Sequence, residues 1–190
     1  MTVFPFPADA AEISAPFSVV GFDWETGTPE GELLIVPEGT DAPPFDGPVW
    51  SPAAARDWPG LLRPAGAAPA GSPVWLSCAC TAGTLEHRLR EAAAAFGARL
   101  WLRLEPQSAL YHPPCPTEAG RPVTAAELAA VRAAHPVFDC PEFVCRCCHW
   151  DDGGRLSVLL FDTEETIGKK LGLAASLDIP YVFGPFPLDR

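Results

Sequence analysis

Long apolar runs are missing from this sequence. No window of about 18 consecutive apolar residues occurs, so we expect no membrane-spanning helix. The opening segment Met1–Pro7 lacks the basic start and the continuous apolar stretch of a signal peptide, which predicts a cytoplasmic location. Because 48% of the residues are nevertheless hydrophobic, the composition favours a folded globular chain over a disordered one.

Basic charge is scarce as well. Lysine and arginine number 13 against 24 aspartates and glutamates, which gives a formal net charge of −11. No stretch is rich enough in lysine or arginine to neutralise phosphates, so we expect neither nucleic acid nor an anionic membrane surface as a partner. The glycines form neither a phosphate-binding loop nor a dinucleotide fingerprint, and the sequence therefore indicates no nucleotide cofactor.

Proline divides the chain into two regions of one expected domain, residues 1–190. Residues 1–72 contain about half of the 23 prolines, which interrupt helices and sheets, so this region should be largely irregular. Its exception is 17–36, where two apolar runs flank a turn-rich segment and predict a hairpin with a long loop. Residues 73–190 instead alternate between strand and helix patterns.

The first half of this second region predicts a β-α-β unit followed by a helix. Strands are expected over 74–78 and 98–104, around a helix over 84–96 that stops at Gly97. The apolar stripe of that helix consists of Leu85, Leu89, Ala92 and Phe96. Thr124 and Glu127 form a capping box, with Val123 and Leu128 as a hydrophobic staple, for a helix that should end near His135.

The last part of the chain carries the strongest hairpin signal. Strands over 142–148 and 155–161 flank the turn 151–154, whose residues tolerate positive φ. Asp162 with Glu165 offers the N-terminal cap of a third helix, to about Leu177. Gly168 and Gly172 lie one turn apart in that helix and would allow close contact with a neighbouring element, at a propensity cost of about 1 kcal/mol each. A final strand is expected over 179–183.

This closing part resembles the end of glycoside hydrolase family 18 barrels. The resemblance covers 143–186, under a third of the chain, and its motifs are an acidic pair after a strand, a Thr-Ile helix start, a lysine one turn on and a final strand. These are the runs Trp150–Gly154, Val158–Ile167, Lys169–Ala174 and Ile179–Phe183. Members of the family are (β/α)₈ barrels that act on N-acetylated sugars. A complete barrel needs about 250 residues, so we expect an α/β fold built as a partial or rearranged barrel-like mixed sheet with about three helices.

The same resemblance implies two candidate catalytic residues. The family carries a strand-end motif D-x-x-D-x-D-x-E, and 18–25 aligned with it keeps only Asp23 and Glu25. Ser18 and Gly21 stand at the other acidic positions, and Phe183 stands where the family usually places a tryptophan. A carboxyl acid needs a partner whose environment separates their protonation states, so the loss of half the carboxylates favours a non-catalytic chain.

Cysteine is abundant, and it leaves two interpretations open. The chain has seven cysteines, so complete pairing is impossible, and without an export signal we expect reduced thiols. Soft metal ligands gather within ten residues at Cys140, Cys145, Cys147, Cys148 and His149. The first interpretation is that these residues form a zinc site. No C-x-x-C knuckle is present, and alternating strand residues point to opposite faces, so we favour small buried thiols and expect no cofactor.

Two further residues are candidates for ligand binding. Trp150 adjoins the acidic turn and offers a flat apolar face, and Asp162 follows a strand. The sequence thus predicts a non-catalytic or eroded glycosidase-like domain whose cleft at the strand ends binds a carbohydrate or another small molecule. One alternative is an active glycan hydrolase with Glu25 as the acid. Another is a protein-interaction module, zinc-stabilised or not, in which exposed sheet edges favour a homo-oligomer.

Overall fold

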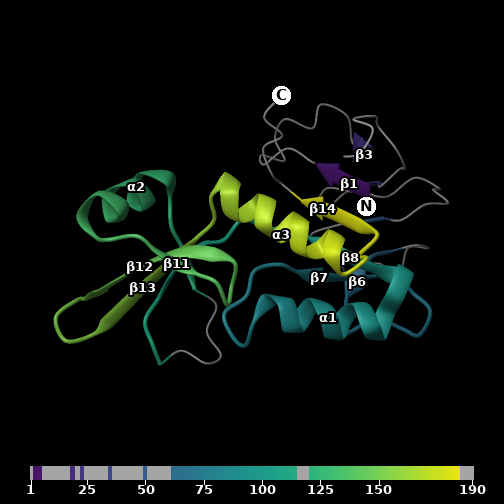
Figure 1. The fold of residues 1–190 in the computed structure, drawn as a ribbon, viewed down its shortest axis with the longest axis horizontal. Helices are drawn as coiled ribbons and strands as arrows, with labels where there is room; N and C mark the ends of the chain where they lie inside the picture. The colour runs from purple at the N-terminus through teal and green to yellow at the C-terminus, as the bar shows by residue number, and fades with distance from the viewer. Residues whose placement is uncertain are drawn as a thin grey trace. The chain divides into compact units, whose positions relative to one another are not determined.

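The computed structural model describes residues 61–114 and 120–184, together with the backbone of five short strands between residues 2 and 50 (Figure 1). The chain divides into two compact units. Unit 1 comprises Met1–Cys78, Arg88–Glu105 and Ala174–Arg190, and unit 2 comprises Ala79–His87 and Pro106–Leu173. Among the described residues, no helix combines the length and the apolar character needed to cross a membrane.

Unit 1 is built on a six-stranded sheet of order β3-β1-β14-β8-β7-β6. All neighbouring strands in it run parallel except β1 and β3, which are antiparallel. The strands are β1 (Thr2–Pro5), β3 (Phe22–Asp23), β6 (Arg63–Pro64), β7 (Val74–Ser77), β8 (Leu100–Arg103) and β14 (Tyr181–Gly184). A smaller sheet contains β2 (Ser18–Val19), β4 (Leu34–Ile35) and β5 (Val49–Trp50).

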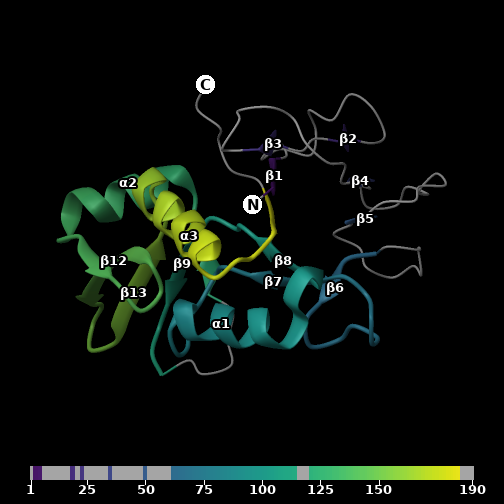
Figure 2. The ribbon, with the colours of Figure 1, turned by 45° about the vertical axis from the view of Figure 1, so that its right-hand side comes forward.

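The predicted β-α-β unit is confirmed. Strands β7 and β8 pair in parallel, and α1 (Leu85–Phe96) connects them and runs alongside them (Figure 2). The helix ends at Gly97, whose φ of 54° lies in the left-handed region that glycine adopts without strain. In β8, Trp101 is buried together with Leu100 and Leu102, so both faces of this strand are covered, as is usual for a parallel strand.

The predicted hairpin over 17–36 is correct only in part. β2 and β4 pair antiparallel, with Ser18 opposite Ile35. Phe22 and Asp23, expected in the same first strand, pair instead with β1 in the larger sheet. The loop between these strands lies outside the described residues. The first apolar run is thus divided between two sheets, and this division depends on partners far away in the sequence.

The proline-rich region and the alternating region share one sheet. Arg63 and Pro64 of β6 pair in parallel with Val74 and Trp75 of β7, across the expected boundary at residues 72 and 73. Between them the chain makes turns, with Ala67 N–H donating to the carbonyl of Pro64 at 2.9 Å. The assignment of residues 1–190 to one domain stays a prediction.

Unit 2 is built on a five-stranded antiparallel sheet of order β10-β9-β13-β12-β11. Its strands are β9 (Ser108–Tyr111), β10 (Arg121–Pro122), β11 (Phe138–Cys140), β12 (Cys145–Asp151) and β13 (Leu156–Phe161). The helix α2 (Ala125–Ala134) covers one face through a core of Cys148, Leu159 and Phe161, against which Leu128 and Val131 pack. The predicted capping box is present at its N-terminus, and His135 is its C-cap.

The hairpin of β12 and β13 is confirmed, although its first strand begins and ends three residues later than the predicted 142–148. Its strands pair from Arg146 opposite Phe161 to Asp151 opposite Leu156. Gly153 and Gly154 have φ values of 65° and 90°, and Gly154 N–H donates to Asp151 Oδ1 at 2.6 Å. The short strand β11 was not predicted. It consists of only three residues, too few for an alternating pattern to stand out.

The described residues form an α/β fold with three helices, as predicted, and they form no closed barrel. Parallel strands joined by a helix, as in unit 1, are the building block of a (β/α) barrel. The antiparallel sheet of unit 2 departs from that pattern. The partial, barrel-like α/β description therefore holds for the architecture of the chain.

The third helix, α3 (Glu164–Ser176), contains two glycines that do not make the expected close contact. A Cβ added at Gly168 or Gly172 would meet no other described atom within 4 Å. We therefore predict that Gly168→Ala and Gly172→Ala each raise the free energy of unfolding by about 1 kcal/mol, because alanine is the better helix former. Urea denaturation of each variant measures this, and destabilisation by either change would contradict an open helix surface.

Candidate functional site

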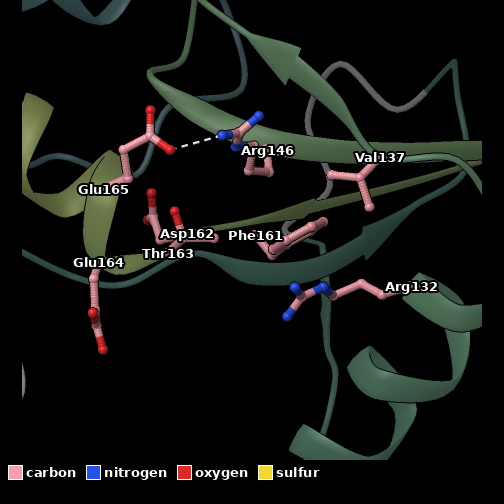
Figure 3. Close-up of a pocket in the computed structure, with 8 residues that line it drawn as sticks. All are labelled: Arg132, Val137, Arg146, Phe161, Asp162, Thr163, Glu164 and Glu165. Atoms are coloured by element: carbon pink, nitrogen blue, oxygen red, sulfur yellow. Dashed lines mark hydrogen bonds and ion pairs between the residues drawn. The ribbon is translucent and has the colours of Figure 1, made fainter.

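A cleft opens in unit 2 where β13 ends and α3 begins. It has a volume of about 540 Å³ (Figure 3). Its lining residues come from α2, the segment between α2 and β11, β12, and the junction of β13 with α3: Arg132, Val137, Arg146, Phe161, Asp162, Thr163, Glu164 and Glu165. Of the residues predicted from the sequence to bind a ligand, Asp162 lies in this cleft.

Asp162 is held by a set of buried partners. Its Oδ2 accepts from Lys170 Nζ at 2.7 Å and from Gln107 N–H at 2.6 Å, and its Oδ1 accepts from Thr166 Oγ1 at 2.8 Å. The side chains of Lys170 and Asp162 are 0% and 1% exposed. Because both oxygens already have donors, this carboxylate fixes the junction between β13 and α3. A direct role in ligand binding stays a prediction.

The N-terminal cap of α3 differs from the predicted one. Thr166 N–H donates to Thr163 Oγ1 at 3.3 Å, and Thr163 N–H donates to Thr166 Oγ1 at 2.8 Å. This reciprocal pair takes the place expected for Asp162 and Glu165. Asp162 binds the buried Lys170 instead, and Glu165 turns outward to surface cations, so neither carboxylate is available to cap the helix.

Glu165 is a carboxylate on the wall of the cleft that is paired with two cations. It accepts from Lys169 Nζ at 2.6 Å and from Arg146 Nη2 at 2.8 Å, and Arg146 also pairs with Asp139 at 2.7 Å. The hydrogen bonds from Lys169 and Arg146 lower the pKa of Glu165. The group is therefore ionised at neutral pH and unsuited to act as a general acid.

Arg132 is the cation of the cleft that has no carboxylate partner among the described residues. Its guanidinium lies over the ring of Phe161, 5.4 Å from the ring centroid, and the side chain is exposed. Figure 3 shows Arg132 and Arg146 on either side of Phe161, with only Arg146 joined to an acid. A cation over an aromatic face is attracted to the ring and remains able to donate to an incoming group.

Trp150 does not line this cleft. It is half-buried, packs against the core cluster beneath α2, and stacks on His135 with ring centroids 4.7 Å apart. Its predicted role as a sugar platform stays untested. Of the two candidate catalytic residues, Asp23 is described only by its backbone, which pairs with Thr2, and Glu25 lies outside the described residues.

The proposed zinc ligands do not converge. Within the described part of the chain, no three side chains of histidine, cysteine, aspartate or glutamate are placed to hold a metal ion. Cys148 is buried in the core beneath α2, whereas His149 is exposed and stacks on Phe138, with centroids 5.0 Å apart. Burial raises the pKa of Cys148, and also of the other candidate thiols Cys140, Cys145 and Cys147. The candidate ligands do not converge because neighbouring residues of a strand point to opposite faces of the sheet.

Sequence reasoning missed Lys170, Gln107 and Arg132. A signal for Lys170 was present: it lies four residues from both Thr166 and Ala174, on the helix stripe that is buried. A lysine on such a stripe needs a buried anion, and Asp162 at the end of the preceding strand is the natural partner. Gln107 gave no signal, because its contact with Asp162 is made by the backbone.

Comparisons with known proteins find partial likeness among solved structures. The Bacillus megaterium spore cortex-lytic enzyme SleL matches at 11% identity and a TM-score of 0.47, over 72% of this chain and 37% of that one. The Bacillus cereus spore cortex-lytic enzyme SleL matches at 12% identity and a TM-score of 0.41, over 52% and 24%. No protein-family model and no curated protein matches the chain. The chain spans less than half the length of each of these two structures, and at this level neither likeness assigns an activity to it.

Proposed function

We propose that this chain is a non-catalytic, glycosidase-like domain that binds a carbohydrate or a similar small polar ligand in the cleft at the end of β13. The observation that carries the proposal is Arg132, an exposed cation without a carboxylate partner among the described residues, set over the apolar ring of Phe161. A sugar ring offers hydroxyls to such a donor and an apolar face to the residues around it. The volume of about 540 Å³ falls within the range of small-molecule sites.

The other groups of the cleft fit a polar, uncharged ligand. Thr163 contributes a hydroxyl, and Glu164 and Glu165 contribute carboxylate acceptors for hydroxyl donors. Val137 is 42% exposed and supplies apolar surface, whereas Phe161 lies beneath Arg132 and is only 1% exposed. Cations and carboxylates together disfavour a strongly charged ligand of either sign, because each would meet like charge.

The carboxylates of the cleft also support the absence of catalysis. Glycoside hydrolysis needs a carboxylic acid that protonates the leaving group, and most families add a second carboxylate as nucleophile or base, a role that the substrate itself takes over in substrate-assisted families. In this cleft Asp162 is buried against Lys170, and Glu165 is kept ionised by two cations. The carboxylate of Glu164 points away from both in Figure 3. These three acids therefore do not form such a pair.

We predict that Arg132→Ala weakens binding of an N-acetylglucosamine oligosaccharide by about tenfold, the usual loss for one hydrogen bond from a charged donor. Isothermal titration calorimetry of the full chain measures the dissociation constant. Arg155→Ala is the matched control, since Arg155 is also exposed but lies in the turn between β12 and β13. Equal affinity of wild type and Arg132→Ala would place the ligand elsewhere, and no binding at millimolar sugar would reject a carbohydrate ligand.

The same oligosaccharide also distinguishes this proposal from the alternative of an active hydrolase. The proposal expects no hydrolysis of the oligosaccharide by wild-type protein, because the three carboxylates of the cleft do not form a pair of acid and second carboxylate. If wild type cleaves the sugar and Glu25→Gln abolishes that cleavage, the enzyme hypothesis with Glu25 as acid replaces this one. Mass spectrometry of the sugar after incubation distinguishes the two results.

A further inference from the structure

Strands β11 and β12 place two cysteines directly opposite each other. In this antiparallel pair Cys140 faces Cys145, at the end where the turn at 141–144 joins the strands. Residues that face each other in an antiparallel pair have Cα atoms about 4.5–5.5 Å apart. This separation lies within the range of about 4.4–6.8 Å that a disulfide can bridge.

The two thiols also interact and are accessible to small molecules. Each thiol affects the pKa of the other, and Cys140 Sγ also donates to Glu142 Oε2 at 3.9 Å. Both residues line a cavity of about 370 Å³ beside α3, together with Asp139, Thr166 and Lys169. Cys140 is half-buried, and Cys145 is 2% exposed. A small oxidant in the cavity therefore meets Cys140 first, with Cys145 immediately behind it.

The neighbouring cysteines of β12 are placed differently. Cys147 faces Phe138 and is only diagonal to Cys140. Diagonal neighbours across two strands lie about 7–8 Å apart, too far for a disulfide without backbone movement. Cys148 belongs to the core cluster beneath α2, on the opposite face of the sheet. Within this pair of strands only Cys140 and Cys145 have the required geometry.

We propose that Cys140 and Cys145 form a reversible oxidation site, at which a hydroperoxide such as hydrogen peroxide converts the two thiols into an intramolecular disulfide. Cys140 first attacks the peroxide, and its sulfur becomes a sulfenic acid while one water leaves. Cys145 then attacks that sulfur, the S–S bond forms, and a second water leaves with the sulfenic oxygen. Two sulfurs are each oxidised by one electron, and the two peroxide oxygens are reduced to water.

The environment of the pair predicts how the reaction proceeds. The thiolate is the reacting form, and burial raises the pKa of Cys140 and of Cys145. Oxidation should therefore be slow at neutral pH and should accelerate as pH rises towards these pKa values. Facing Cβ atoms start about 4.5–5.5 Å apart, and a disulfide needs about 3.5–4.5 Å, so the strands must approach slightly. Such a bond is easily reduced, so dithiothreitol should restore both thiols.

The test uses the folded full-length protein with limiting hydrogen peroxide, followed by alkylation, trypsin digestion and mass spectrometry. Trypsin releases the peptide 133–146, which contains both cysteines. We expect this peptide to lose two hydrogens and to escape alkylation. A protease that cuts after Glu142 then leaves its two halves joined until dithiothreitol is added. The proposal is overturned if the halves separate, if Cys140 accumulates as sulfinic acid instead, or if the linkage joins either residue to another cysteine.

Two variants control the assignment. Cys147→Ser removes the adjacent thiol of the same strand and should leave the disulfide yield unchanged. Cys140→Ser changes the half-buried partner, so the fold should tolerate it better than a change at Cys145, and it should leave Cys145 reduced after the same treatment. A disulfide to Cys145 that persists in Cys140→Ser would also overturn the proposal. If neither variant folds, the peptide map of the wild-type protein still tests the proposal.

Discussion

Lys170→Met should lower the free energy of unfolding by about 3–5 kcal/mol, the usual cost of leaving one member of a buried ion pair without its partner. The Lys170 and Asp162 side chains are 0% and 1% exposed, and their charged atoms are 2.7 Å apart. Methionine has a similar length but no charge, so the variant keeps most of the packing and leaves the Asp162 carboxylate to Thr166 Oγ1 and Gln107 N–H alone. Urea denaturation gives the difference through the transition midpoint.

The adjacent residue provides the control for this prediction. Lys169 is 54% exposed and pairs with Glu165 at 2.6 Å, so Lys169→Met should cost at most about 1 kcal/mol. The double variant Lys170→Met with Asp162→Asn removes both charges and should recover part of the lost stability. If Lys169→Met and Lys170→Met lower the free energy of unfolding equally, burial does not govern the contribution of the Lys170–Asp162 pair.

Gly184→Ala should destabilise the chain by about 3 kcal/mol or more, because no space exists for a methyl group at the end of β14. A Cβ at this position would overlap the carbonyl oxygen of Leu104 and lie 2.9 Å from its carbonyl carbon. Backbone atoms cannot rotate away as a side chain can. The Leu104 N–H also donates to the Phe183 carbonyl at 2.7 Å, so moving the strands apart would lengthen that bond. Thermal and urea unfolding both report the loss.

Gly66→Ala is the matched change for Gly184→Ala. Gly66 lies in the turn after β6, and a Cβ there would meet no described atom within 4 Å. We expect a change within about 0.5 kcal/mol, as for other surface substitutions. Should Gly184→Ala prove equally mild, β8 and β14 would have to separate more easily than their hydrogen bonding and burial indicate.

The elements with local signals could be predicted from the sequence. The capping box of Thr124 and Glu127 and the stop at Gly97 appear where expected, and the predicted turn at 151–154 forms one residue later, at 152–155. Each depends on residues within four positions of one another, so neighbouring side chains suffice to specify it. The candidate site was predicted only through Asp162, and its surroundings were predicted as a helix cap rather than a buried ion pair.

Long-range pairing explains what the sequence could not reveal. Phe22 and Asp23 join β1 rather than the expected hairpin, and β1 in turn pairs with β14 from the other end of the chain. The register that sets Cys140 opposite Cys145 needs the strand β11, which is too short to show a pattern. Likewise, Arg132 reaches Phe161 only because α2 packs on the sheet.

The sequence by itself determined the α/β class, the helices and the hairpin of β12 and β13, because apolar periodicity, caps and turn residues act over a few positions. Tertiary structure alone decided which charges are buried, which thiols face each other and that Arg132 has no carboxylate partner among the described residues. Those properties depend on strand register and on the packing of α2 and α3 within unit 2, where residues more than 20 positions apart come into contact, as Arg132 and Phe161 do.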